Sequence, residues 1–222
     1  MKRSLSLVLG CAAVFASFYS SAQAQILNVQ FTDNVRGNAL NGDSWGPTVS
    51  ALAYTGTTWT STFADSGSDL PYSDDSASTI GYTVSNVNTS NNGGSSLDMF
   101  QETFVSNAMT LTINGLSDSK SYDIYLYGAY DSIFNSTFTI GSATKATAGV
   151  SGNDSTFTEG VSYVEFTNIA PTSNAITVSI TPGNGFALIE GFQLAVAPEP
   201  STYAMMLVGA GALVWFARRK LA

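Results

Sequence analysis

The sequence predicts an all-β protein, an antiparallel β-sandwich with one short helix. Apolar and polar residues alternate in many short segments, turn residues separate those segments, and helical periodicity is scarce. The predicted sandwich spans residues 25–196, a length suited to a single domain with a sizeable core. Residues 1–24 and 197–222 differ from it in composition and are expected to be targeting segments.

Period-two alternation places the expected strands. The clearest examples are Leu27 to Phe31, Met109 to Ile113, Phe138 to Ile140, Val164 to Phe166 and Ile176 to Ile180. Such alternation is typical of half-buried antiparallel strands with one face in water. Turn residues follow several of these runs, at Asn114-Gly115, Gly141, Gly152, Pro182-Gly183 and Asn184-Gly185.

Helical spacing is found at one place. Between Ser96 and Val105, the apolar residues Leu97, Phe100 and Phe104 recur at helical intervals, and Ser96 is a candidate N-cap. The sequence therefore predicts a short helix there. The segments 65–78, which is acidic, and 86–95, which is rich in Ser, Asn and Gly, are expected to be long loops.

The second half of the domain carries a recognisable order of strands and aromatic residues. It comprises Ile113–Leu116, Lys120–Gly128, Ser136–Gly141, Glu159–Phe166 and Ala187–Leu194. This arrangement resembles the galactose-binding-like jelly roll of many bacterial carbohydrate-binding modules and of malectin-like domains, over roughly Ala108 to Val196. The resemblance implies a jelly-roll sandwich and raises sugar binding as a function, although a fold alone does not fix a function.

Three tyrosines are the candidate sugar-binding residues. Tyr125, Tyr127 and Tyr130 lie close together, and the first two share one face of an expected strand whose other face carries Ile124 and Leu126. Aromatic side chains can stack on sugars, and they can equally fill a core. For Trp45 and Trp59, the sequence likewise leaves open whether they bind a sugar or fill the core.

Composition excludes several classes of chemistry. Residues 25–196 contain no His and no Cys, which removes Ser-His-Asp triads, Cys-His dyads, His-based metal sites and disulfides. Three cations stand against 15 acidic residues, a net charge of −12, which disfavours nucleic acid as a partner. Ser and Thr make up 47 of the 172 residues, as in many exported β-proteins with hydroxyl-rich surfaces.

Acidic residues leave two chemical hypotheses open. Asp65, Asp69, Asp74 and Asp75 cluster in one segment and could hold a structural calcium ion, although a solvated acidic loop is the simpler interpretation and no metal site is assigned. Glu165 and Glu190 could in principle form a glycosidase pair. We expect no enzymatic activity and no catalytic residue.

The N-terminus has the layout of a secretory signal. Lys2-Arg3 precedes an apolar run from Leu5 to Phe18, and Ala22-Gln23-Ala24 fits the small-x-small cleavage pattern. Cleavage after Ala24 would begin the mature chain at Gln25. Cys11 raises a lipoprotein alternative, but the apolar run continues past it.

The C-terminus has three parts in a fixed order. Pro198-Glu199-Pro200 is followed by an apolar stretch from Tyr203 to Ala217 and then by Arg218, Arg219 and Lys220. The apolar stretch predicts a single, marginally long transmembrane helix, and the three cations favour a cytoplasmic end. The order resembles the PEP-CTERM sorting signal of Gram-negative bacteria.

That resemblance implies partners and a location. The partners are an exosortase and the Sec export machinery, with inner-membrane anchoring through the C-terminal segment before processing. The destination is the cell envelope, the outer surface or the extracellular matrix. We therefore expect a non-catalytic structural or adhesive component associated with exopolysaccharide or biofilm. A carbohydrate-binding module is the alternative, and a glycoside-active enzyme is a more distant one.

Overall fold

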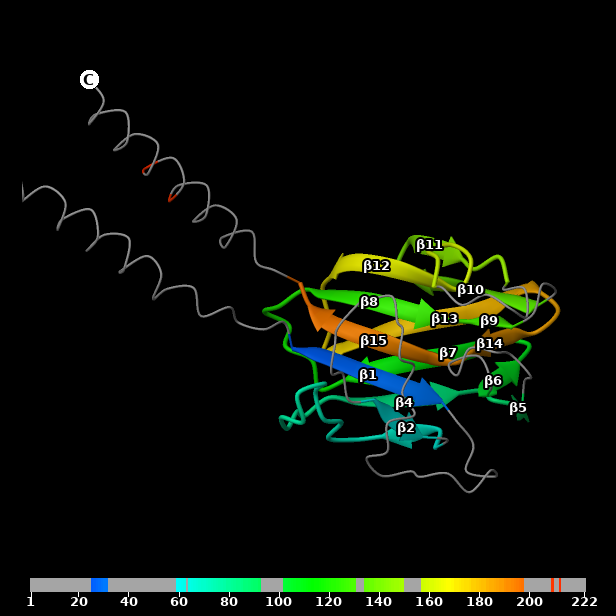
Figure 1. Ribbon diagram of the computed structural model, residues 1–222, viewed down its shortest axis with the longest axis horizontal. Coiled ribbons are helices and arrows are strands. Elements are labelled where there is room, and N and C mark those ends of the chain that lie inside the picture. Colours follow the sequence, from blue (N-terminus) through cyan, green and yellow to red (C-terminus); the bar gives the residue numbers. More distant parts are fainter. Residues whose placement is uncertain are drawn as a thin grey trace, which may run out of the picture.

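A computed structural model describes residues 25–31, 59–62, 64–92, 102–130, 134–149 and 157–197, together with Gly209 and Ala212. Strands make up 57% of the structure and helix only 2%, which confirms the predicted β-sandwich (Figure 1). Several predicted sites lie outside the described residues, namely Ala22, Ala24, Trp45, Pro198, Glu199, Pro200, Arg218, Arg219 and Lys220. Of the predicted C-terminal helix, Gly209 and Ala212 are described, and both are helical.

The first layer of the sandwich, sheet A, has five strands. They are β1 (Ile26–Phe31), β2 (Thr60–Thr62), β8 (Tyr122–Tyr127), β12 (Tyr163–Ile169) and β15 (Gly191–Val196). Their spatial order is β12-β8-β15-β1-β2, and every neighbouring pair is antiparallel except β1 and β2. The first and last strands of the domain therefore lie side by side.

The second layer, sheet B, has seven strands. They are β3 (Ser66–Gly67), β4 (Gly81–Ser85), β7 (Met109–Asn114), β9 (Ala129–Tyr130), β10 (Phe134–Ile140), β11 (Ala143–Ala146) and β13 (Ala175–Asn184). The order is β11-β10-β13-β7-β4-β3, with β9 beside β10. A small third sheet joins β14 (Ala187–Ile189), β6 (Glu102–Ser106) and β5 (Thr89–Asn92) in that order.

The core fills the space between the two sheets. Sheet A contributes Ile124, Leu126, Phe192 and Leu194, and sheet B contributes Leu111, Ile113, Phe138, Val178 and Ile180, all essentially buried. Phe31, Tyr82 and Phe192 meet at ring-centroid distances of 5.3 to 6.2 Å. Each such side chain contributes roughly 1.5–3 kcal/mol by leaving water. Apolar residues at every second position thus hold the two layers together.

The two sheets differ in their outer faces. On sheet B, β13 alternates buried and exposed residues, as the sequence predicts. On sheet A, all six residues of β1 are buried, including Asn28 and Gln30. The prediction that polar residues of this strand face water is therefore wrong. Successive side chains of β1 still point to opposite faces of sheet A. Both faces of the sheet are buried at this strand.

Three predicted segments need correction. The helix expected from Ser96 to Val105 does not exist over residues 102–105, because Glu102–Ser106 is strand β6, paired with β14 and β5. Residues 93–101 lie outside the described residues. The loops expected over 65–78 and 86–95 contain strands β3 and β5, respectively. Pairing between strands distant in the sequence outweighed the local helical spacing, which is a weak signal over ten residues.

The sandwich has two distinct ends. Ile26 pairs with Ala195, and the Ala197 amide donates a hydrogen bond of 2.9 Å to the Ser121 carbonyl, so the chain enters and leaves sheet A at one end. Phe31, Tyr127 and Asn184, the last residues of β1, β8 and β13, lie at the other end together with Glu190, which directly precedes β15. The two ends can be followed along these strands in Figure 1. We call these the tail end and the distal end.

Candidate functional site

The outer face of sheet A carries polar and aromatic side chains in cross-strand rows. Pairing places Glu165, Tyr125, Gln193 and Asn28 in one row across four strands. The next row runs from Tyr163 through Tyr127 and Gly191 to Gln30. Both predicted sugar-binding tyrosines of β8 therefore lie on this face, while Ile124 and Leu126 point into the main core as alternation predicts.

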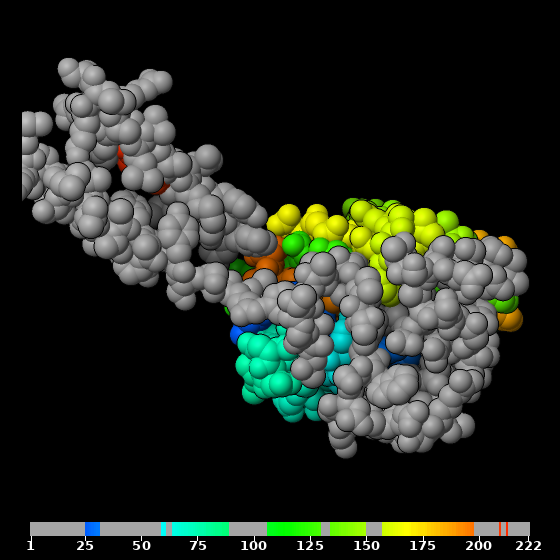
Figure 2. All heavy atoms as spheres, in the orientation of Figure 1, coloured from blue at the N-terminus to red at the C-terminus, as the bar shows by residue number. Residues whose placement is uncertain are grey.

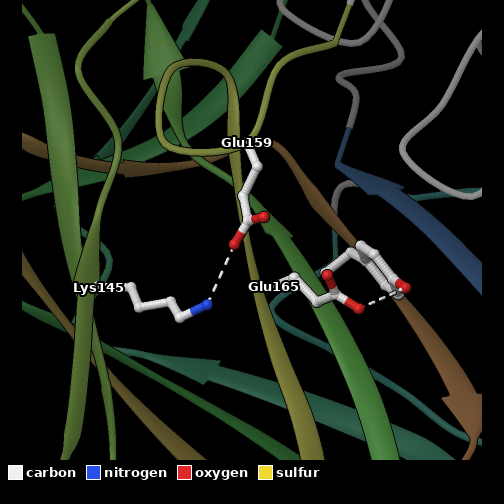
Figure 3. Close-up of polar contacts among 4 residues, drawn as sticks. Lys145, Glu159 and Glu165 are labelled. Carbon is white, nitrogen blue, oxygen red and sulfur yellow. Dashed lines mark hydrogen bonds and ion pairs between the residues drawn. The ribbon is translucent and has the colours of Figure 1, made fainter.

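A hydrogen bond links Tyr125 to Glu165. The tyrosine hydroxyl donates to Glu165 Oε1 at 2.7 Å, from β8 to the edge strand β12 (Figure 3). Burial and, after it, this hydrogen bond to a carboxylate raise the pKa of Tyr125. The phenol is therefore a firmly protonated donor, not a base.

Tyr127 begins a second, fully buried polar chain. Its hydroxyl donates to the Gln193 side-chain carbonyl, and Gln193 Nε2 donates to Asn28 Oδ1 at 2.8 Å. Tyr127 and Gln193 have no solvent exposure, and Asn28 has almost none. Burying a side-chain amide without a hydrogen-bond partner costs free energy. This chain of hydrogen bonds therefore explains how sheet A can bury polar residues on its outer face.

Three further aromatic residues pack on the two tyrosines. Trp59, Phe157 and Tyr163 are partly buried against Tyr125 and Tyr127. The ring of Tyr127 meets those of Trp59, Phe157 and Tyr163 at centroid distances of 6.5, 5.3 and 5.9 Å, in edge-on or tilted geometry. Burial raises the pKa of Tyr163, with Glu159 adding to the effect. These rings form an aromatic cluster whose members contact one another.

The aromatic cluster has one unsatisfied donor. The buried Trp59 Nε1 has no hydrogen-bond partner within the described part of the chain. The structure thus places Trp59 beside the candidate tyrosines, an arrangement that the sequence left open. The backbone of Tyr130 lies in β9, opposite Phe134, while its side chain is outside the described part. The position of this third candidate tyrosine relative to the other two stays a prediction.

Glu190, the second residue of the hypothetical glycosidase pair, is fully buried at the distal end. The Ala129 amide donates to its Oε2 at 3.4 Å, and its Oε1 has no partner among the described residues. Burial raises the pKa of Glu190 well above the usual range, against a smaller opposing effect of the Ala129 hydrogen bond. Glu165 makes its own hydrogen bond to Tyr125, so the two carboxyls bond to different partners.

The acidic segment proposed for calcium lies on the surface at the tail end, drawn in teal (Figure 2). Asp74 accepts hydrogen bonds from the amide and hydroxyl of Ser76, which lower its pKa. No group of three or more acidic, His or Cys side chains gathers into a metal site within the described ranges, which include Asp65, Asp69, Asp74 and Asp75.

The edge between the sheets is joined by Lys145. Its Nζ lies 3.0 Å from Glu159 Oε1 (Figure 3). The same Nζ lies 5.8 Å from the centroid of the Phe166 ring. β11 belongs to sheet B and Phe166 to sheet A, so one side chain contacts both layers. The ion pair is about half exposed and adds little stability by itself.

Sequence reasoning missed an exposed aromatic pair at the distal end. Phe186 is 49% exposed, and its ring stacks on that of Phe134 at 6.3 Å and 22°. Among the large hydrophobic side chains of the described residues, Phe186 is the exposed one, and the others are buried or partly buried. The position of Phe186 after the turn residues Asn184-Gly185 places it near a loop, but its exposure follows only from the tertiary structure.

Likeness to solved structures is low in sequence and in superposition. A calcium-binding mutant of Bacteroides uniformis beta-glucuronidase 2 is 14% identical, with a TM-score of 0.35 over 77% of this chain and 19% of that chain. An exo-beta-1,3-galactanase from Phanerochaete chrysosporium with galactose is 18% identical, with a TM-score of 0.30 over 55% of this chain and 31% of that chain. This chain thus spans less than a third of either protein. A comparison with curated proteins finds no match.

Within the part of the chain that the structure describes, no helix is both long and apolar enough to cross a bilayer. The family comparison concerns the C-terminus. The model of the PEP-CTERM protein-sorting motif matches residues 196–220, which include the Pro-Glu-Pro tripeptide and the three basic residues. This match begins at Val196, the last residue of β15. The motif implies export, a membrane-anchored stage and cleavage by an exosortase. The chain is therefore an exported β-sandwich protein that carries a PEP-CTERM protein-sorting motif.

Proposed function

We propose that this protein is a non-catalytic structural or adhesive component of the exopolysaccharide or biofilm matrix. The observation that carries the proposal is the sorting motif at residues 196–220, which begins at the last residue of the last strand of the sandwich. The Sec machinery would export the chain, and an exosortase would process it at the inner membrane of a Gram-negative cell. The sandwich would then reach the envelope surface or the matrix.

The geometry supports a role without catalysis. Glycoside hydrolysis needs two carboxyl groups that both reach the substrate. Glu190 is buried and receives one long hydrogen bond, while Glu165 is bonded to a tyrosine on the neighbouring strand. On the outer face of sheet A, hydrogen bonds link Tyr127 to Gln193 and Gln193 to Asn28, as in a stabilising network. Polysaccharide degradation abolished by Glu165→Gln or Glu190→Gln would contradict this part of the proposal.

Cell fractionation tests the location and role. Cells that produce the full chain should release it into the matrix fraction. A chain that lacks residues 218–222 has lost the basic end of the motif and should remain in other fractions. Loss of the gene should weaken matrix cohesion. A full chain that never reaches the matrix, in cells with an active exosortase, would refute the proposal.

A carbohydrate-binding module is the second candidate, and the stacked pair Phe134 and Phe186 favours it. An exposed ring at the end of the sandwich can stack on a sugar, whereas the rings of Tyr125 and Tyr127 are covered. Phe186→Ala should then weaken retention on a glycan column without lowering the melting temperature, because half of that ring is already in water. Unchanged retention would leave the matrix role as the better explanation.

A further inference from the structure

The outer face of sheet B carries hydroxyl side chains in register across its strands. Pairing aligns one row as Ser66, Thr83, Thr112 and Thr177, and a second as Ser85, Thr110, Ser179, Thr139 and Thr144. Thr137 and Thr181 pair in a third row. The residues between them along each strand, such as Leu111 and Val178, point into the core. The face is therefore a grid of hydroxyl groups.

The spacing of this grid follows from strand geometry. Neighbouring strands lie about 4.8 Å apart, and every second residue along a strand is about 6.7 Å further on. The branched side chain of threonine is restricted at χ1, so its hydroxyl is held in few positions. If a polymer with a regular repeat binds this face, the threonine side chains therefore lose little conformational entropy on binding.

The grid is uncharged although the domain is strongly acidic. Among the described residues, the acidic ones lie elsewhere, in loops, on sheet A or, for Glu102, in β6 of the third sheet: Asp65, Asp69, Asp74, Asp75, Glu102, Asp118, Asp123, Glu159, Glu165 and Glu190. Lys145 of β11 turns away from the grid toward Glu159 and Phe166. The exposed strands of soluble domains usually carry charged residues among the uncharged polar ones. A sheet face with hydroxyl groups and no charge is therefore unusual.

Most of these hydroxyls are free to bond outward. Thr139 and Thr144 bond to each other at 3.0 Å, and the Ser85 hydroxyl lies 3.5 Å from the Thr110 carbonyl. Within the described part of the chain, Thr83, Thr177, Ser179 and Thr181 are exposed and have no side-chain hydrogen bond to protein. Each hydroxyl offers one donor and two acceptor positions.

We propose that the outer face of sheet B binds a neutral polysaccharide. A polysaccharide presents hydroxyl groups at regular intervals along its length, and a neutral one matches the absence of charge on the grid. Individual hydroxyl contacts are weak because water competes for them, but many contacts along one polymer add to a useful affinity. The inference rests on the matrix role proposed above and names the surface that would perform it.

Affinity electrophoresis of the protein in the form that cells export tests the proposal. The gels would contain galactomannan or hydroxyethyl cellulose as neutral probes and alginate as an acidic probe. The test variant combines Thr83→Val, Thr112→Val and Thr177→Val, which remove three hydroxyls of one row and keep side-chain shape and strand preference. Thr167→Val on β12 and Thr172→Val outside the grid are matched controls, since both residues are exposed.

We expect a neutral probe to retard the wild type and both controls, and the triple variant to bind about tenfold or more weakly. Replacing the same three residues by Ser keeps the hydroxyls and should retain binding. Equal retardation of the Val variant, retardation by alginate alone, or no retardation by any probe would overturn the inference. So would a concentration-dependent dimer that the Val variant abolishes, because the face would then join two copies of the chain.

Cell fractionation separates this inference from the matrix role. If the wild type enters the matrix and the triple Val variant enters it equally, the hydroxyl grid is not the binding surface and the matrix role stands. If the wild type does not enter the matrix, the matrix role itself fails. Melting curves of all variants confirm that any change in binding does not come from unfolding.

Discussion

At the scale of single residues, Glu190 is a carboxyl group that folding has removed from water. The backbone around it is well bonded, since the Phe31 amide donates to its carbonyl at 2.8 Å and its own amide donates to the Tyr127 carbonyl at 2.9 Å. Its side chain is poorly satisfied, with one oxygen that has no partner among the described residues. An ionised carboxylate in this position would be costly, so the folded state favours the protonated form.

This predicts a pH dependence of stability. The pKa of Glu190 is raised in the folded state, so between its ordinary value of 4.5 and that raised value the folded chain holds a proton that the unfolded chain has lost. The stabilisation of the folded state by the proton on Glu190 is therefore fully present below about pH 4, and it is lost as the pH rises through the folded pKa. Glu190→Gln should remove this loss and raise the melting temperature at neutral and alkaline pH.

Melting curves of both proteins from about pH 4 to about pH 9 check this prediction. Glu165→Gln is the matched control, because Glu165 is partly exposed and already paired. A difference between wild type and Glu190→Gln that does not change with pH would show that Glu190 does not titrate in this range.

Tyr127 shows how one side chain can serve both the aromatic cluster and the polar chain. Tyr127→Ala should destabilise the protein by about 3–5 kcal/mol, as large aromatic truncations do in buried sites. Tyr127→Phe keeps the ring packing and leaves Gln193 without this donor, at a cost of about 1–3 kcal/mol. Denaturant unfolding of the two variants separates the two contributions.

Tyr125 provides the comparison on the same strand. It is 8% exposed and bonds to a carboxylate at the sheet edge, so Tyr125→Ala should cost less than Tyr127→Ala. Large losses in both variants would remove support for a sugar platform on this strand. Near-wild-type stability of both, together with weaker glycan binding, would restore it.

At the scale of elements, the turns show which glycines the fold requires. Gly115 follows β7 with φ +76°, and a Cβ placed there would lie 2.0 Å from the Thr79 carbonyl oxygen. Gly141 lies between β10 and β11 with φ +59°, and nothing described is within 4 Å of its Cβ position. Both conformations are in the left-handed region, but of the two only Gly115 is also sterically confined.

Alanine substitutions should therefore differ in their effects. Gly141→Ala should cost about 1 kcal/mol, which is the backbone strain alone. Gly115→Ala adds a clash with rigid backbone and should cost several times as much, about 3 kcal/mol or more. Urea unfolding of the two variants measures the difference, and equal losses would show that the loop carrying Thr79 moves aside easily.

Strand pairing decided what local sequence could not. Residues 102–105 have helical spacing but pair with β14 and β5, so the expected helix is a strand there. The bulge between Asn135 and Ser136 turns the Ser136 hydroxyl inward, where it bonds to the Leu188 carbonyl and amide at 2.7 and 2.8 Å. Contacts between segments about 50 residues apart thus fix the distal end.

At the scale of the whole molecule, the tail leaves from a central strand. β15 lies between β1 and β8, and the Ala197 amide is the last described backbone donor before the sorting motif continues. Ala197 is itself buried. A cut on its C-terminal side removes no described strand, so we expect processing to leave the folded sandwich unchanged.

This predicts the site and consequence of processing. A protease that acts at Pro198-Glu199-Pro200 meets a segment that proline keeps extended, and the product keeps all of β15. Intact-mass analysis should find mature chains that end near these residues, with the melting temperature of the unprocessed protein. Mature chains that still end at Ala222, in cells with an active exosortase, would contradict the prediction.

The sequence alone determined the fold class, the facing of most side chains and the sorting signal. These depend on local information: the two-residue period of strands, the turn residues and the linear order of tripeptide, apolar stretch and cations. The positions of Ile124 and Leu126 in the core and of Tyr125 and Tyr127 on the other face follow from that period alone.

Only the tertiary structure decided which faces are covered. Asn28 and Gln193 look like solvent-facing residues in the sequence, but they are buried and bonded to each other across neighbouring strands. Phe186 looks like a core residue but lies half exposed, and the hydroxyl grid of sheet B can be seen only when strand register is known. The physical reason is that alternation tells which side of a sheet a residue takes, whereas its contact with water depends on segments that are distant in the chain.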